Sequence, residues 1–236
     1  MGAKAIKFVG PKQAGPEEED RPARTILPAK RKLLDAALHV IRAKGYAATT
    51  VDDICRQARV TKGSFFHHFK SKDDLALAAV AYWRAMTEEF FATAPYHAAT
   101  DPLERLLGYL DFRASILTGH LPEYTCLLGT LVQETYDTHP AIRTACEQAL
   151  SAHVAELTRD LQAAKKLRAP KAAWTAKSVG NLIQSVLQGA YIFAKAQQSP
   201  ATIHESLEHL RRYLQFLLPA AAITPTTSAR NPRTKK

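Results

Sequence analysis

Apolar residues recur three and four positions apart along almost the whole chain between residues 28 and 218. This spacing places them on one face of an α-helix. No segment alternates apolar and polar residues for long enough to indicate a β-strand. Prolines separate the helical stretches, and several lie where the first turn of a helix tolerates them. The pattern therefore predicts an all-α fold.

The helix boundaries are best defined near the N-terminus. The first predicted helix covers about Pro28–Lys44, and Gly45 follows where a left-handed residue usually ends a helix. Thr50 and Asp53 have the spacing of a capping box, which predicts the start of a second helix. A third, short helix begins at Thr61, and a fourth follows it.

Five longer helices are predicted for the rest of the chain. Their approximate ranges are 102–119, 122–136, 139–166, 171–197 and 200–218. The segments 172–197 and 201–218 carry more apolar and small residues than one buried face needs. Either the first of them is a central core helix packed on all sides, or the two form a helix pair that packs against its copy in a homodimer.

The net charge of +10 is unevenly distributed. Residues 29–75 carry ten Lys and Arg against five Asp and Glu, whereas residues 76–223 carry thirteen against thirteen. Residues 224–236 carry four basic residues and no acidic one. A local basic surface is typical of proteins that bind a polyanion such as nucleic acid. The alternative is a soluble protein whose surface is merely rich in Lys and Arg.

The two ends of the chain have the composition of unfolded segments. Residues 1–27 contain several Pro and Gly residues and the acidic run Glu17–Asp20, which predicts a flexible leader. Residues 224–236 predict a disordered basic tail.

Several classes of protein are excluded. No apolar run is long enough to cross a membrane, and three widely spaced cysteines do not form a disulfide framework. We therefore expect a cytoplasmic protein. His204 and His209 are five residues apart, whereas a zinc-binding HExxH helix needs four. The sequence has no Gly-x-Ser-x-Gly motif, phosphate-binding Gly loop or CxxC pair, so we expect no enzyme, metal site or cofactor.

The most specific signal is the stretch 49–72, which reads TTVDDICRQARVTKGSFFHHFKSK. Two short helices joined by a tight turn form a helix-turn-helix, whose second helix enters the DNA major groove. That helix starts with small and polar residues, which allow close approach, and its N-terminus presents free N–H groups to phosphate. Phe65 and Phe69 are four residues apart and are expected to face the core.

This region closely resembles the DNA-binding domain of the TetR family of bacterial transcriptional regulators. The resemblance covers about residues 30–77 and includes LLDAALHVIRAKGYAATTVDDI, the third-helix motif KGSFFHHF and the following SKDDL. It implies a homodimer with a helix-turn-helix domain over residues 28–75 and a helical effector-binding and dimerisation domain over residues 76–223. Members of the family usually repress from a palindromic operator and are released by a small molecule.

The resemblance also implies which residues contact DNA. Contacts to the backbone fall on Thr50, Phe66, His68 and Lys72. Contacts to bases fall on Thr61, Lys62, Gly63, Ser64 and His67. Two positions depart from the family pattern: Phe66 is commonly Tyr, and the turn residue Arg59 is usually Gly. The alternative is that the histidines and lysines belong to an ordinary solvated surface.

The C-terminal part resembles the branch of the family that includes the electrophile-sensing NemR and the acrylate-responsive AcuR. That branch carries the pattern Gly-Cys-Leu-x-Gly-Asn, of which Cys126 is retained here while Thr125 and Thr130 replace the Gly and the Asn. Cys126 is either a sensor thiol or a small buried apolar residue. The candidate effector-pocket residues are Cys126, Thr130, Gln133, Tyr109, Phe112 and Trp83.

One further class stays open. An effector-independent or architectural DNA-binding protein would share the helix-turn-helix. A neutral C-terminal part of about 150 residues is larger than DNA binding alone requires, which favours a regulator with an effector.

Overall fold

The computed structural model describes residues 27–219, and within them the chain is helical with no β-strand. Ten α-helices and one short 3-10 helix follow one another in the order α1 (Pro28–Lys44), α2 (Val51–Ala58), α3 (Lys62–His68), α4 (Lys72–Ala92), η1 (Pro95–Ala98), α5 (Pro102–Ser115), α6 (Leu121–Tyr124), α7 (Leu127–Thr135), α8 (Pro140–Arg168), α9 (Ala176–Gln197) and α10 (Ala201–Leu217). The predicted basic tail and, apart from Leu27, the predicted leader lie outside the described residues.

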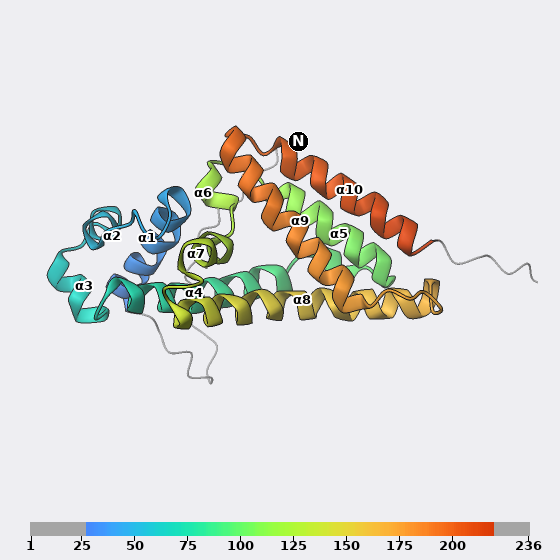
Figure 1. Ribbon diagram of the computed structural model, residues 1–236, viewed down its shortest axis with the longest axis horizontal. Coiled ribbons are helices and arrows are strands. Elements are labelled where there is room, and N and C mark those ends of the chain that lie inside the picture. The colour runs from blue at the N-terminus through green and yellow to red at the C-terminus, as the bar shows by residue number, and fades with distance from the viewer. Residues whose placement is uncertain (1–26, 220–236) are drawn as a thin grey trace, which may run out of the picture.

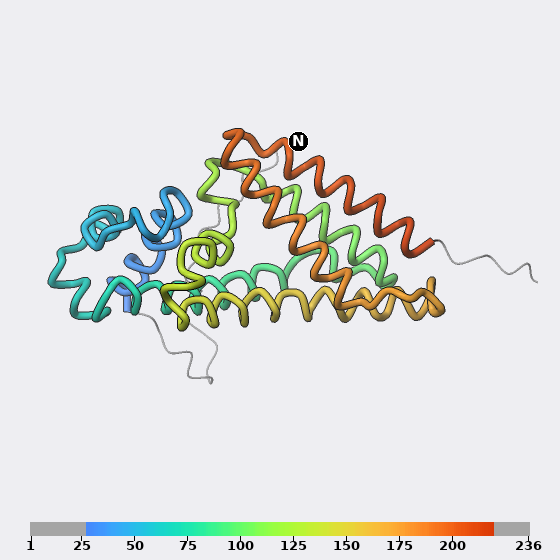
Figure 2. Tube along the Cα trace, in the orientation of Figure 1, coloured from blue at the N-terminus to red at the C-terminus, as the bar shows by residue number. Residues whose placement is uncertain are grey.

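The helices form an elongated molecule with two ends (Figure 1). Helices α1, α2 and α3 make one end, and α5, α9 and α10 make the other. The long helix α8 packs against α4, α5, α7 and α9, so it connects the two ends. The trace in Figure 2 shows α6 and α7 between them, and α1 contacts both of these short helices. No helix of residues 27–219 is apolar and long enough to span a bilayer.

Two clusters of buried apolar residues correspond to these two ends. The first joins α1–α4 to α7 and the first half of α8, with Leu33, Ile54 and Phe65 fully buried. The second joins α5, α9 and α10 to the second half of α8. Cys126 packs against both clusters, so it marks the place where they meet.

The N-terminal helix boundaries confirm the sequence predictions. The Thr50 hydroxyl accepts from the backbone N–H of Asp53, whose carboxylate accepts from the N–H of Thr50, which completes the capping box. Thr61 caps α3 by accepting from the N–H of Ser64. Gly45 has a φ of +86°, as predicted for the residue that ends the first helix.

The predicted helix over 122–136 is wrong, because the chain is interrupted at Thr125 and Cys126. Both residues are extended, with ψ values of 159° and 125°. Arg42 of α1 donates to the carbonyl oxygens of Glu123 and Thr125, each at 3.3 Å. A continuous helix would need these carbonyls for its own hydrogen bonds. The tertiary contact with α1 therefore replaces a turn of helix.

Two other predicted helices are shorter than expected. The helix expected over 102–119 ends at Ser115, and Gly119 beyond it has a φ of +82°. The helix expected to start at residue 171 starts at Ala176, because the Thr175 side chain caps it by accepting from the N–H of Ser178. N-caps of this kind override a merely apolar pattern.

Arg59 provides a test of local backbone strain. It ends α2 with φ 55° and ψ 47°, a left-handed conformation that disfavours side chains with a Cβ. We expect Arg59→Gly to raise the free energy of unfolding by about 0.5–1 kcal/mol, measured by urea denaturation. Gln57→Gly, at an exposed position inside α2, should lower it by about 1 kcal/mol. If Arg59→Gly lowered the free energy of unfolding, the backbone at Arg59 would not be strained.

Candidate DNA interface and effector cavity

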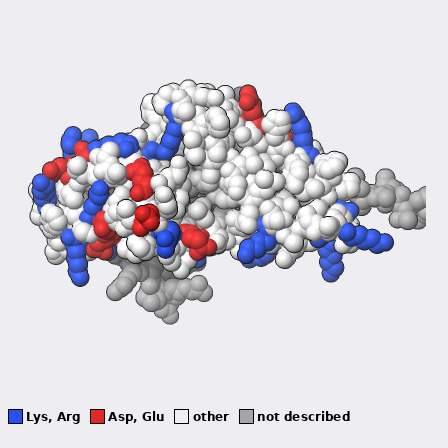
Figure 3. All heavy atoms as spheres, viewed as in Figure 1, with Lys and Arg blue, Asp and Glu red and all other residues white. Residues whose placement is uncertain are grey.

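Helix α3 separates its residues into a buried face and an exposed face. Phe65 and Phe69 are buried, as predicted, and pack in the N-terminal core. Phe66 is 56% exposed and points away from that core. Of the predicted base-contacting residues, Thr61, Lys62, Gly63 and Ser64 lie at the start of this helix and His67 lies in its last turn, and all but the half-buried Ser64 are exposed. In Figure 3, Lys and Arg side chains stand out at this end of the molecule, interspersed with Asp and Glu.

Gly63 has no structural reason to be glycine. A Cβ added there would meet only the Thr61 hydroxyl oxygen, at an ordinary 3.8 Å. Glycine within a helix lowers stability relative to alanine by about 0.5–1 kcal/mol. No described residue fills the space where a side chain at position 63 would lie. This space is therefore open to solvent at the start of α3.

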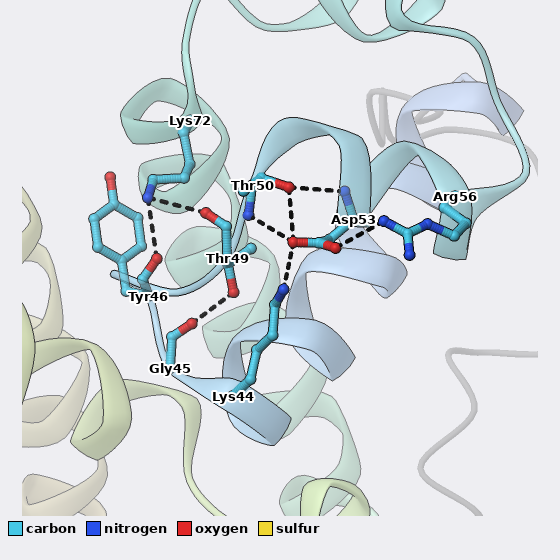
Figure 4. Close-up of polar contacts among 8 residues, drawn as sticks. All are labelled: Lys44, Gly45, Tyr46, Thr49, Thr50, Asp53, Arg56 and Lys72. Carbon is cyan, nitrogen blue, oxygen red and sulfur yellow. Dashed lines mark hydrogen bonds and ion pairs between the residues drawn. The ribbon is translucent and has the colours of Figure 1, made fainter.

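The start of α2 is held by a polar network around Asp53 (Figure 4). Lys44 and Arg56 both pair with its carboxylate, which also accepts from Thr50. The hydrogen bonds from Lys44 and then Thr50 hold the pKa of Asp53 well below its usual range. The structure therefore gives Thr50 a capping role, and its phosphate contact stays a prediction.

Lys72 is likewise engaged within the chain. Its ammonium group donates to the backbone oxygens of Tyr46 and Thr49, both at 3.0 Å, and lies 4.2 Å from the centre of the Tyr46 ring (Figure 4). Lys72 thus ties the start of α4 to the turn between α1 and α2. One of its three N–H donors is left for a phosphate.

Glu134 and Arg42 provide polar links between this N-terminal domain and the rest of the molecule. Glu134 of α7 accepts from the backbone N–H of Ala47 at 2.7 Å. Its carboxylate lies so close to Gly45 that a Cβ at that position would collide with it. Arg42 is the second link, because it bonds the α6 region and lies 4.8 Å from the centre of the Trp83 ring. Burial lowers the pKa of Arg42 to about 10, so it is charged at neutral pH.

A cavity lies between α4, α5, α8 and α9, and it is partly open to solvent. Of the predicted pocket residues, Trp83 and Cys126 line it. Thr130 and Gln133 line an adjacent pocket that also includes Cys126, where Lys195 donates to the Thr130 hydroxyl at 2.9 Å. Phe112 instead packs its ring against Phe90, with 5.0 Å between the ring centres.

The cavity contains an arginine that the sequence interpretation missed. Arg113 donates from Nε to the Tyr109 hydroxyl at 2.9 Å, from Nη1 to the Tyr191 hydroxyl at 3.4 Å and from Nη2 to His153 Nε2 at 3.1 Å. Since arginine can only donate, His153 Nε2 carries no hydrogen. Burial, and then the charge of Arg113, lowers the pKa of His153 to about 3. The ring is therefore neutral.

A signal for this cluster exists in the sequence. Tyr109 and Arg113 are four residues apart and so share one face of a helix. The remaining partners, His153 and Tyr191, come from two other helices, so the sequence alone does not bring them together. Tyr109 was predicted for the pocket, and here it positions Arg113 at the cavity wall.

Within residues 27–219, no group of three or more His, Cys, Asp or Glu side chains is placed to hold a metal ion. His204 and His209 lie on the exposed side of α10, as expected for an ordinary surface helix.

The three-helix unit with an exposed third helix, attached to a larger helical domain with a cavity, defines a helix-turn-helix regulator. Residues 33–79 match the family model of bacterial regulatory proteins of the tetR family, and residues 102–209 match the C-terminal domain of LmrA/YxaF-like transcriptional regulators. The transcriptional regulator AcuR of Cereibacter sphaeroides is 30% identical over 182 residues, which cover 75% of this chain and 80% of AcuR. The chain therefore belongs to the TetR family of transcriptional regulators.

Other relatives agree with this assignment. The uncharacterized regulator YxaF of Bacillus subtilis is 25% identical over 167 residues, or 70% of this chain and 84% of YxaF. The structure of regulatory protein TetR from Rhodobacter sphaeroides superimposes with a TM-score of 0.71 at 24% identity, covering 79% of this chain and 99% of that one. Reduced NemR of E. coli gives a TM-score of 0.69 at 19% identity, covering 83% and 100%. These two structures show a shared fold.

The neutral state of His153 predicts a pH dependence of stability. In the folded chain the His153 ring takes up its second proton only below about pH 3. In the unfolded chain it takes up that proton below its ordinary pKa of 6.5. Stability is therefore lost as the pH falls below about 6.5. Between about pH 7.5 and pH 5.0, we expect the wild type to lose about 2 kcal/mol more than His153→Gln, which keeps an acceptor but does not titrate. Urea denaturation at both pH values measures this, and equal losses would refute it.

Proposed function

We propose that this protein is a cytoplasmic repressor that binds a palindromic DNA operator as a homodimer and is released by a small-molecule effector. The observation that carries the proposal is the exposed start of α3, where Gly63 leaves space that the described chain does not use. A major groove accepts a helix whose N-terminal residues approach the base edges closely. The cavity in the larger domain favours this function over an effector-independent or architectural DNA-binding protein.

The contacts proposed for DNA are those that the resemblance to the TetR family implies. Thr61, Lys62, Gly63, Ser64 and His67 are assigned to bases, and Thr50, Phe66, His68 and Lys72 to the backbone. Burial, followed by the nearby charges of His67 and Lys30, lowers the pKa of His68 from its ordinary value. Phe66 offers an apolar contact to the sugar-phosphate.

The homodimer is proposed to form through α9 and α10. In the single chain these helices expose large apolar side chains, which are Leu182, Ile192, Phe193, Tyr213 and Phe216, with exposed fractions from 37% to 82%. A Cβ at Gly189 of α9 would meet no atom within 4 Å, so this part of the helix is also uncovered. An apolar surface on two adjacent helices is typical of a face that a second copy covers.

We propose that ligand binding is transmitted to the DNA-binding domain through Arg42 and Glu134. A ligand in the cavity contacts Trp83, and Trp83 lies against Arg42 of α1. The short helix α7 begins after Cys126 at the cavity and ends near Glu134, which holds the α1–α2 turn. A shift of α4 or α7 on binding would therefore change the placement of α3, as a population shift between two dimer geometries. An electrophilic effector would meet the thiol of Cys126 in the same cavity.

The test is selection of bound sequences from random duplex DNA by the purified protein. We expect enrichment of a palindrome whose half-sites lie about 34–36 Å apart, because each dimer presents two copies of α3 to successive major grooves. Recovery of unrelated sequences would refute a specific operator.

Gly63→Ala separates stability from DNA binding. Because the added methyl group meets no close neighbour, we expect the free energy of unfolding to rise by about 0.5–1 kcal/mol. Affinity for the selected operator should fall at least about tenfold, or about 1.4 kcal/mol, measured by fluorescence anisotropy. Ala85→Gly, at an exposed position of α4, makes the reverse change and should lower stability without altering affinity. Unchanged operator affinity of Gly63→Ala would remove Gly63 from the interface.

Phe193→Lys tests the proposed dimer. Phe193 is 58% exposed, and a lysine there would place two charges in a symmetric apolar interface. We expect the protein to sediment as a monomer and to lose operator affinity. Tyr136→Lys alters an aromatic residue of similar exposure, 62%, outside α9 and α10 and should stay dimeric. A dimeric Phe193→Lys protein would place the interface elsewhere.

A further inference from the structure

The positive charge of Arg113 has no carboxylate partner among residues 27–219. Its three hydrogen-bond acceptors are the hydroxyls of Tyr109 and Tyr191 and a ring nitrogen of His153. All three are uncharged at neutral pH. Its Cζ also lies 4.4 Å from the centre of the Phe91 ring, but none of these partners carries a full negative charge, so a bound anion would supply the missing countercharge.

The acids that share the cavity wall are engaged elsewhere. Glu88 pairs with Arg84 at 2.6 Å. Glu123 accepts from the backbone N–H of His120 at 3.0 Å. Glu156 lies 3.9 Å from Arg159. None of these carboxylates lies within ion-pairing distance of Arg113, so the charge at the cavity wall is not neutralised by the described chain.

Arg113 keeps hydrogen-bond donors that its protein partners do not use. A guanidinium has five N–H groups, and the three bonds to the tyrosines and to His153 use one each on Nε, Nη1 and Nη2. One N–H therefore remains on each terminal nitrogen. Two neighbouring N–H groups of this kind bind the two oxygens of one carboxylate.

A second, independent observation points to a ligand in the same cavity. Gln184 Oε1 and Gln188 Nε2 are buried and have no hydrogen-bond partner in the described chain. Both residues line the cavity that Arg113 lines. An unpaired buried acceptor and donor each lower stability by about 1–3 kcal/mol, and a polar ligand would satisfy them. The walls between these groups are largely apolar, and they include Phe91, Ile116 and Leu187.

We propose that this cavity is a receptor site for a small organic carboxylate, with Arg113 as the anchor of its carboxylate and with an apolar body against the cavity walls. The proposal rests on the proposed function, in which the cavity receives the effector, and it names the chemical class of that effector. A hydroxyl or amide group on the ligand would in addition pair with Gln184 and Gln188.

Pairs of acids and amides of equal shape test the site without DNA. Propanoate and propanamide, hexanoate and hexanamide, and benzoate and benzamide differ in charge and little in size. We expect isothermal titration calorimetry with the purified dimer to show at least one acid binding about tenfold or more tightly than its amide, because Arg113 is desolvated. Equal affinities within every pair, or no binding of any acid at millimolar concentration, would overturn the proposal.

Variants locate the binding group. We expect Arg113→Gln to lose acid affinity about 30-fold or more while Arg84→Gln, which removes a cavity arginine already paired with Glu88, stays within about threefold of wild type. If Arg113→Gln does not fold, Arg113→Lys takes its place, because it keeps the positive charge. Arg113→Lys should lose acid affinity about fivefold, because an ammonium group has one donor nitrogen and does not bind both carboxylate oxygens as a guanidinium does. Loss of binding in Arg84→Gln, with binding retained by the Arg113 variant that folds, would refute the assignment.

The proposed function has a separate readout. The acid that binds is added to the complex of wild-type dimer and selected operator, and the Arg113→Gln dimer is tested for operator affinity. Failure to select an operator counts against the proposed DNA function, whereas charge-selective binding through Arg113 in the absence of DNA supports the carboxylate site whatever the operator assay shows.

Discussion

Arg42 holds the architecture together. Its guanidinium is buried between the N-terminal domain and the rest of the chain, where it donates to carbonyl oxygens of α1 and of the α6 region and packs on Trp83. Removing this charge from water is unfavourable, and the carbonyl dipoles and the ring compensate for it. The contact interrupts a helix and at the same time joins the helix-turn-helix domain to the wall of the cavity. A buried cation at this position therefore couples the two halves of the molecule.

Positive charge has two different uses in this protein. At the start of α3, Lys62 is exposed and pairs with the equally exposed Asp52, and an exposed cation of this kind suits a salt-dependent attraction to the phosphate backbone of DNA. In the cavity, Arg113 is held by neutral partners and largely removed from water, which suits selection of one small anion. The same side-chain chemistry thus serves a broad polyanion at one end and a specific ligand at the other, because solvent exposure differs.

Several local features are unfavourable for stability and cluster where function is proposed. Gly63 weakens the first turn of α3, and the unpaired amide atoms of Gln184 and Gln188 lie at the cavity. Each would be removed easily by substitution if stability alone mattered. Departures from local rules of this kind are expected at sites that an external partner completes.

The sequence by itself determined the all-α fold, the capped helices of the N-terminal domain and the exposed face of α3, because helix periodicity, caps and the helix-turn-helix are local patterns. It also indicated Trp83 at the cavity from its place on an apolar helix, and Cys126 from the resemblance to the branch that includes NemR and AcuR. Only the tertiary structure decided the break at Thr125, where a carbonyl bonds to Arg42 some eighty residues earlier in the chain. Only the tertiary structure brought His153 and Tyr191 to Arg113, because hydrogen bonds between distant helices leave no periodic trace in the sequence.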